Sequence, residues 1–322
     1  MCFGGLRGTA WANAFQTSVF VVLGALTVMI IVSDHGGLGV ALAKVAEISP
    51  QLLKREGSYD TVQFASYVLI PLSAGTFPHL FMHWLTARRA ETFRWPIILY
   101  PLCIAVVWLP SVLLGVMGRL DFPDLSGPAA SGVLVAMIQA HAPGLLAGLL
   151  AAGVLAAVMS SLDSQVLAVG TMFTQDVVRH YGYQDRMSEK QQILCARLFV
   201  SLILLTTFVV SLVVNRSIFR LAIWSFTGFA SLFPIIVAAL FWRRTSSQGV
   251  IASILSVAAL WIYFFTQSWA DPTYTVLGSG LMPVVITVAG SCLALVGVSL
   301  LTDPVQTEVV DRILGRRDEA SG

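Results

Sequence analysis

Leu145–Phe173 reads LLAGLLAAGVLAAVMSSLDSQVLAVGTMF, an apolar run with a single charged residue, Asp163. A helix needs about 20 mostly apolar residues to cross the hydrocarbon core of a bilayer, so this run is long enough to span a membrane. A carboxylate near the middle of such a helix costs about 3 kcal/mol on insertion scales and usually faces a polar cavity or a cation. Asp163 is therefore the first functional candidate in the chain.

Other apolar runs of similar length fill the rest of the 322-residue chain, which is 57% hydrophobic and 11% charged. Soluble domains carry about 25% charged residues. Because only helices and closed barrels satisfy their backbone within a bilayer, runs of this length predict an all-α integral membrane protein with about eight transmembrane helices. The chain is expected to form one membrane domain, 1–322, with a cytoplasmic tail at 303–322. The predicted spans are 12–33, 61–87, 95–117, 144–176, 192–214, 217–242, 247–268 and 280–302.

Basic residues are distributed unevenly between the two sides of these spans. With the N-terminus inside, the inner segments carry twelve lysines and arginines and the outer segments carry five. Cytoplasmic loops carry the excess of Lys and Arg in multi-pass proteins. We therefore expect both termini in the cytoplasm, a loop at 88–94 inside and a loop at 118–143 outside. The expected location is the plasma membrane, which is the inner membrane in a bacterium.

Two predicted spans look broken rather than continuous. The second has Pro71, Gly75 and Pro78 within eight residues, and the sixth has Gly228 and Pro234. Proline removes a backbone donor and clashes with the preceding turn, so freed carbonyls need other partners. Discontinuous helices are the usual indication of a transporter binding site, although proline also produces ordinary packing kinks. We predict that both spans are broken and that they line a solute path around Pro78 and Gly228.

Small and hydroxyl side chains surround Asp163. Ala157, Ser160, Ser161 and Ser164 are separated by three, four and seven residues, which places them on one stripe of a helix. Their oxygens, with a carboxylate, form a hard ligand set that suits sodium and does not suit zinc. The alternative is a stripe for close helix packing, with each serine bonded to its own backbone. The presence of Asp163 favours the sodium site.

Two histidines follow the predicted break in the second span. His79 and His83 are four residues apart, immediately after Pro78. One interpretation is a pair that contacts a proton or an anion. The other is two imidazoles that bond to the backbone near the cytoplasmic headgroups. We place His79, which directly follows the break, on the predicted solute path.

The sequence lacks the residues that membrane enzymes need. A single deep carboxylate does not make an aspartyl dyad, and Gly278–Gly280 has no histidine at helical spacing. No glycine-rich phosphate loop opens a helix, and the four cysteines form no CxxC motif or Cys/His cluster. We therefore expect that the protein is not an enzyme, uses no cofactor and binds no nucleic acid. The expected partners are membrane lipid, an ion and a small solute.

Two segments resemble the sodium:solute symporter family. The opening FGGLRGTAWANAFQ, residues 3–16, is similar to that family's loop before core helix five. The segment MSSLDSQ, residues 159–165, followed by TQD at 174–176, is similar to core helix eight and is the more specific motif. The resemblance covers essentially the whole chain. It implies an inverted-repeat (LeuT-like) transporter fold with five-helix halves.

In the register of this resemblance, the eight spans correspond to core helices five to ten and two C-terminal helices. The first four core helices have no counterpart, so we expect a partial fold that represents the C-terminal part of a symporter. The resemblance implies sodium-coupled symport of a small organic solute. The alternative is a non-transporting membrane fragment, or an assembly partner that needs a separate N-terminal half.

The resemblance also implies roles for individual residues. Ala157, Ser160 and Ser161 match the helix-eight half of the family's principal sodium site. Asp163 and Ser164 match a second sodium site of some members, nearer the cytoplasm, which also uses an aspartate of helix five. This chain has Asn13 at that helix-five position. The carboxylate of the second site is therefore expected on Asp163 instead.

The resemblance gives little information about the solute. Phe77-Pro78-His79 is similar to a Pro-His pair of monocarboxylate-type members, which indicates a small organic anion. Proline, pantothenate and sugars stay open as alternatives.

Overall fold

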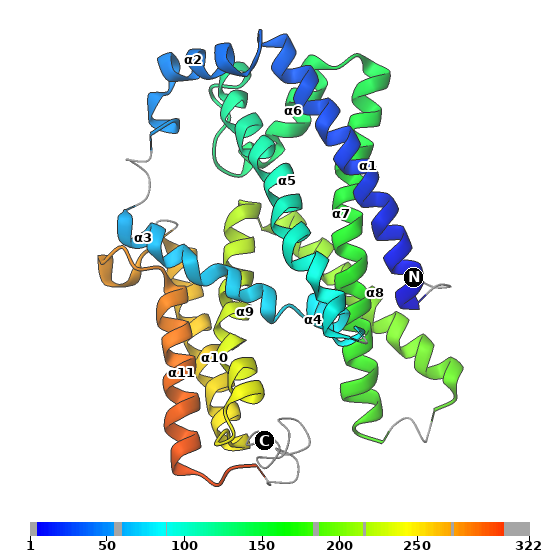
Figure 1. Cartoon of the computed structure of the whole chain (residues 1–322), viewed down its shortest axis with the longest axis vertical. Helices are drawn as coiled ribbons and strands as arrows, with labels where there is room; N and C mark the ends of the chain where they lie inside the picture. Colours follow the sequence, from blue (N-terminus) through cyan, green and yellow to red (C-terminus); the bar gives the residue numbers. More distant parts are fainter. Residues whose placement is uncertain are drawn as a thin grey trace. The chain divides into compact units, whose positions relative to one another are not determined.

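The structure is all-helical, as predicted. The computed structural model describes residues 5–54, 60–87, 89–182, 187–214, 217–271 and 274–305. These residues contain no strand, and seven of their helices are long and apolar enough to cross a membrane, or eight when one bent pair is counted as a span. The chain divides into two units, Met1–Arg55 with Met82–Ile218 and Glu56–Phe81 with Phe219–Gly322. Figure 1 shows the order of the helices along the chain.

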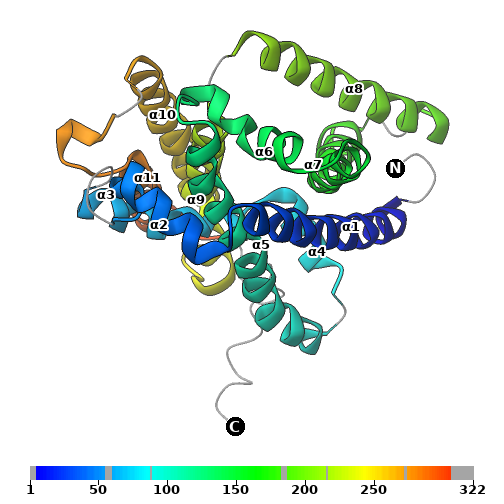
Figure 2. The ribbon, with the colours of Figure 1, turned by 90° about the horizontal axis from the view of Figure 1, so that it is seen from above.

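Long apolar helices dominate the first unit. In it, α1 and α7 lie side by side (Figure 1, Figure 2), and α7 continues into a π-helical turn, Phe173–Arg179. Shorter 3-10 turns occur at Pro50–Leu52, Ala90–Phe93 and Gly127–Gly132. The α-helices are α1 Gly5–Asp34, α2 Leu38–Ile48, α5 Arg94–Asp121, α6 Val133–His141, α7 Gly144–Met172 and α8 Glu189–Val213.

Helix ends in this unit follow from local sequence. Gly36 and Gly37 have φ angles of 84° and 101°, a region that favours glycine, and they end α1. Ser188 begins α8 with a capping box, in which its hydroxyl accepts from the Gln191 backbone and the Gln191 side chain accepts from the Ser188 backbone. Between these ends α8 exposes Leu198, Leu202 and other large apolar side chains, as a helix in contact with lipid does.

The second unit packs through small hydroxyl residues. Ser231 on α9 donates to Thr287 on α11 at 2.7 Å, and Ser253 on α10 lies 2.9 Å from Ser291 on α11. Small side chains let membrane helices approach closely. The elements are α3 Thr61–Ser66, the 3-10 helix η2 Tyr67–Gly75, the first part of α4 Pro78–Leu85, α9 Ile218–Phe241, α10 Ser247–Ala270, the 3-10 turn Val276–Gly278 and α11 Pro283–Leu301.

The predicted break in the second span is confirmed. The segment Thr61–Gly75 and the helix Pro78–Leu85 meet at an angle of 49°. Pro71 lies inside the 3-10 helix η2, and Pro78 begins α4. Since three breaking residues fall within eight positions, the chain cannot restore a regular α-helix between them.

The predicted break in the sixth span is wrong. Helix α9 is continuous through Gly228 and Pro234. A lone proline removes one backbone donor, and a lone glycine costs about 1 kcal/mol in a helix interior. Packing of the buried residues Thr227, Ala230 and Ser231 offsets that cost.

Two short helices lie where only loops were expected, α2 and α6, the second of them within the loop predicted at 118–143. Helix α2 falls between the first two predicted spans, and at 11 residues it is too short to cross a bilayer. Its Ala41 is buried in a cluster with Ile31 of α1 and Met117 of α5. Of the predicted tail, residues 306–322 lie outside the described residues. The assignment of the whole chain to one membrane domain stays a prediction.

Candidate functional site

A close contact between α1 and α7 forms the frame of the candidate cation site. A Cβ atom on Gly153 would lie 2.8 Å from Cβ of Leu23, so only glycine fits there. Asn13 lies ten residues before Leu23 on α1. It contacts Ser164, which lies eleven residues after Gly153 on α7. The two helices are therefore antiparallel and stay in contact over about three turns. Gly153, which has no side chain, is what allows this approach.

The contact becomes polar where Asn13 meets α7. Nδ2 of Asn13 donates to Oγ of Ser164 at 2.7 Å. Oγ of Ser164 in turn donates to the backbone carbonyl of Ser160 at 3.4 Å. The structure thus joins Asn13, Ser164 and Ser160, three residues predicted for sodium binding. Asn13 and Ser164 come from different helices and are 151 positions apart in the sequence.

Two side-chain oxygens at this contact are buried without a partner. Among the described residues, Oδ1 of Asn13 and Oε1 of Gln16 accept no hydrogen bond. Gln16 lies one turn after Asn13, and the antiparallel register places it level with Ser160 and Ser161. Leaving a buried acceptor unsatisfied costs about 1–3 kcal/mol, so a native structure normally supplies a donor, a water or an ion. Neutral amide and hydroxyl oxygens are the hard donors that a sodium ion takes.

Other predicted sodium residues lie outside this hydrogen-bonded group. Ala157 lines an apolar cavity of about 460 Å³ together with Gly153 and residues of α1, α5 and α6. Ser161 is exposed. Asp163 is half-buried and makes no hydrogen bond or ion pair within the described part of the chain. By helical geometry its side chain leaves α7 about 60° around the helix axis from that of Ser160. Their roles in binding sodium stay predictions.

The residues predicted for the solute path lie in the second unit. The ring of Phe77, directly before Pro78, lies 5.2 Å from Phe226 and 4.9 Å from Phe229, on either side of Gly228. Its neighbour His79 is 5.4 Å from the same ring of Phe77. Pro78, His79 and Gly228 are thus brought to one region of that unit.

Backbone contacts explain this arrangement. The hydroxyl of Thr76 donates to the carbonyl of Phe229 at 2.7 Å, which fixes the break against α9. Gly228 is close to Trp261, since a Cβ at that position would be 3.2 Å from Nε1 of the indole. The same Nε1 donates to the carbonyl of Trp224 at 2.9 Å. The surroundings of Gly228 are therefore aromatic.

Sequence reasoning missed Gln16 as a site residue. The available signal was its spacing of three residues from Asn13, which puts both amides on one face of a helix. It also missed three residues that the structure brings together at helix ends, His35, Asp121 and His141. Nothing in their spacing along the chain indicates that contact.

Comparison with known proteins identifies the family. The model of the sodium:solute symporter family matches residues 1–256. The osmoregulated proline transporter OpuE of Bacillus subtilis is 24% identical over 84% of this chain and 56% of its own length. The sodium/proline symporter of Escherichia coli is 23% identical over 82% of this chain and 54% of its own length. The sodium/pantothenate symporter of Haemophilus influenzae is 22% identical over 78% of this chain and 53% of its own length.

The chain therefore spans about half the length of these relatives, and the matched region includes both segments on which the resemblance rests. Members of this family are membrane transporters and not enzymes. The match to the family model covers well over half of the chain. This multi-pass membrane protein belongs to the sodium:solute symporter family.

Proposed function

We propose that this chain provides a sodium site for the coupled uptake of a small organic solute. The observation that supports it is the pair of buried, unsatisfied oxygens on Asn13 and Gln16 beside Ser164. In this proposal Ser160 and Ser164 supply further oxygens from α7. Asp163 neutralises part of the ion's charge. Ala157 and Ser161 belong to the principal sodium site of the family, and Asn13 belongs to its second sodium site.

The proposed solute carries a carboxylate. Proline and pantothenate, the solutes in the names of two relatives, both carry a carboxylate group. His79 lies at the break beside Phe77, in the region of Gly228, and an imidazole or a freed backbone donor there suits an anionic group. Entry of sodium down a membrane potential supplies about 2.3 kcal/mol per charge per 100 mV to drive uptake.

The proposed topology places both termini in the cytoplasm of a plasma membrane protein. The support is the excess of basic residues, twelve against five, in the segments assigned to the inside. In this arrangement the C-terminal end of α1 faces outward.

Cysteine labelling in intact cells tests that topology. With the four native cysteines replaced, a cysteine at Glu91 is expected to resist an impermeant thiol reagent, because the loop at 88–94 stays on the positive, inner side. A cysteine at Ser126, in the loop at 118–143, is expected to react. Labelling of position 91 from outside, in cells that exclude a control reagent, would overturn the topology.

Reconstitution in vesicles tests the transport proposal. The chain alone is expected to bind sodium without accumulating proline, pantothenate or a monocarboxylate under an imposed sodium gradient. The physical reason is that Ser161 is exposed and Asp163 half-buried in the chain, so the bound ion keeps part of its water and lacks the full enclosure that coupled uptake needs. A sodium/proline symporter in matched vesicles is the positive control.

The two results separate the two functional candidates. Sodium binding without accumulation supports a component that works with another half, which is the assembly-partner alternative. Gradient-driven accumulation shows that the chain is a symporter by itself and contradicts the expected outcome. Absence of sodium binding to the purified chain would remove the proposed site.

A further inference from the structure

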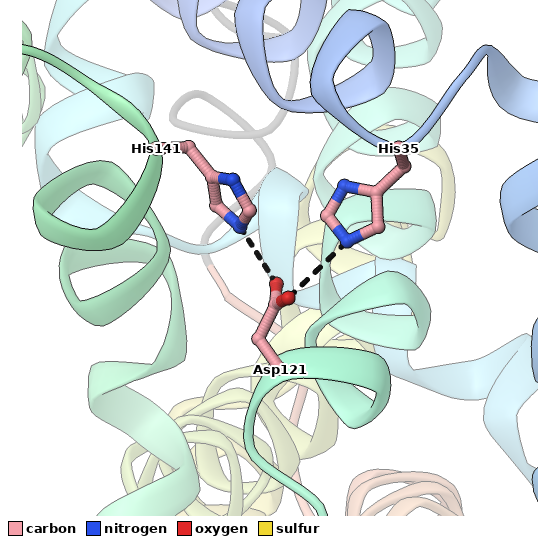
Figure 3. Close-up of side chains that lie close together, drawn as sticks. All are labelled: His35, Asp121 and His141. Carbon is pink, nitrogen blue, oxygen red and sulfur yellow. Dashed lines mark hydrogen bonds and ion pairs between the residues drawn. The ribbon is translucent and has the colours of Figure 1, made fainter.

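Three helix ends meet in the first unit at a cluster of imidazole and carboxylate groups. Helix α1 ends at Asp34, directly before His35, while α5 ends at Asp121 and α6 ends at His141. Figure 3 shows both imidazoles directed at the carboxylate of Asp121. All four residues lie at or beyond the ends of the apolar spans, and the proposed topology places them on the outer side.

The distances within this cluster are short. Nε2 of His141 lies 2.9 Å from one Asp121 oxygen, and Nε2 of His35 lies 3.3 Å from the other. The two rings are 4.9 Å apart. The side chains of His35, His141 and Asp121 are only 9%, 11% and 20% exposed. One donor atom from each residue lies within 4.8 Å of the others.

The other ring nitrogens are already held by acceptors. Nδ1 of His35 lies 2.8 Å from the backbone carbonyl of Ile31, which can only accept, so this nitrogen carries a hydrogen. Nδ1 of His141 bonds to the carboxylate of Asp34. In the neutral form, His35 therefore directs the lone pair of Nε2 at Asp121, and His141 directs one ring lone pair at either Asp121 or Asp34. A ring lone pair and a carboxylate oxygen repel at such distances, so either a metal ion or added protons must lie between the rings and the carboxylates.

We propose that His35, His141 and Asp121 bind a divalent transition-metal ion of the zinc class. Two imidazoles and a carboxylate are a common ligand set for such ions. Ligands about 2.1 Å from a tetrahedral zinc stand roughly 3.4 Å apart. The His35–Asp121 distance of 3.3 Å matches this value, and His141 lies at 2.9 Å from the other oxygen of Asp121. The fourth position is open to water.

The surroundings match what metal-binding histidines require. Such histidines usually donate their second N–H to a carboxylate or a backbone carbonyl, which fixes the tautomer and the ring orientation. Asp34 and the Ile31 carbonyl do this for His141 and His35. A bound ion ties the end of α1, the helix that carries Asn13 and Gln16, to the ends of α5 and α6.

Protons are the competing occupant. Burial lowers the pKa of His141, but hydrogen bonds to Asp121 and Asp34 and the charges of both carboxylates raise it, and the net pKa lies above the ordinary value. With a proton on each Nε2, two imidazolium rings would satisfy the same oxygens without a metal. The experiment must therefore distinguish a metal ion from protons.

Titration of the purified chain with metal tests the proposal. The chain is prepared in detergent through a tag without histidine, stripped with a chelator and titrated with Zn²⁺ by calorimetry and with Co²⁺ by visible absorption. We expect one ion per chain, tetrahedral-type Co²⁺ bands, and their loss when Zn²⁺ is added. His180→Ala, which removes an exposed histidine outside the cluster, is expected to leave binding unchanged.

Variants of the cluster give the second readout. Asp121→Asn keeps the size of the side chain and one acceptor oxygen but removes the charge and the second oxygen, and it is expected to abolish the Co²⁺ bands. Asp34→Asn keeps all three ligands and is expected to weaken Zn²⁺ binding by about 10- to 100-fold. Absence of stoichiometric binding by the unaltered chain, or binding that persists in Asp121→Asn, would overturn the metal site and leave the protonated cluster.

Discussion

Replacing Asn13 with aspartate is expected to strengthen sodium binding by about 10- to 100-fold. The new carboxylate lies beside Ser164 and one turn from the unsatisfied oxygen of Gln16. Attraction between unit charges 4 Å apart is about 4 kcal/mol at an effective dielectric constant near 20, and desolvation of the carboxylate offsets part of it. Binding of radiolabelled sodium to the purified chain measures the change.

Three companion variants define the site. Gln16→Leu removes an oxygen and Asp163→Asn removes a charge, so both are expected to weaken sodium binding, with a smaller effect for Asp163 because it is half-buried. Ser131→Ala, in an exposed 3-10 turn, is the matched control and should bind as the unaltered chain does.

The packing interpretation of the same stripe predicts different results. If α1 and α7 only pack together, Gln16→Leu stabilises the chain by removing an unsatisfied acceptor and leaves sodium binding unchanged. Asn13→Asp then destabilises the chain, because it adds a charge at a largely buried contact. Unchanged sodium affinity in both variants would contradict the cation site.

Replacing Gly249 with alanine is expected to destabilise the second unit by about 1–3 kcal/mol. A Cβ atom at this position would overlap Oγ of Ser299 and lie 2.9 Å from the backbone carbonyl of Leu295. The carbonyl is part of α11 and cannot rotate away. Displacement of Ser299 also removes the acceptor for the Ser246 backbone, and Ser246 caps α10. Thermal unfolding in detergent measures the loss.

A second glycine on the same helix pair serves as the control. Gly297, on α11, has nothing within 4 Å of a built Cβ. Gly297→Ala is therefore expected to be neutral or to stabilise the chain by up to about 1 kcal/mol, since alanine is the better helix former. Equal unfolding temperatures for the two variants would show that the α10–α11 contact tolerates the extra methyl group.

The sequence predicted the features that depend on nearby residues. The membrane class and the approximate spans follow from the length of apolar runs, because every residue in a bilayer-spanning helix meets the same hydrocarbon. The break at Pro71–Pro78 follows from three breaking residues close together. The resemblance of residues 159–165 to the symporter family also lies within one segment, and the family match confirms it.

Tertiary structure decided which distant residues meet. Asn13 and Ser164 were separate candidates, and their hydrogen bond depends on the close approach of α1 and α7 at Gly153. The continuity of α9 through Pro234 depends on packing that offsets a lost backbone bond. The cluster around Asp121 forms because three helices end at one place. Each of these features is set by the three-dimensional packing of helices, which neither the run lengths nor the local motifs of one sequence encode.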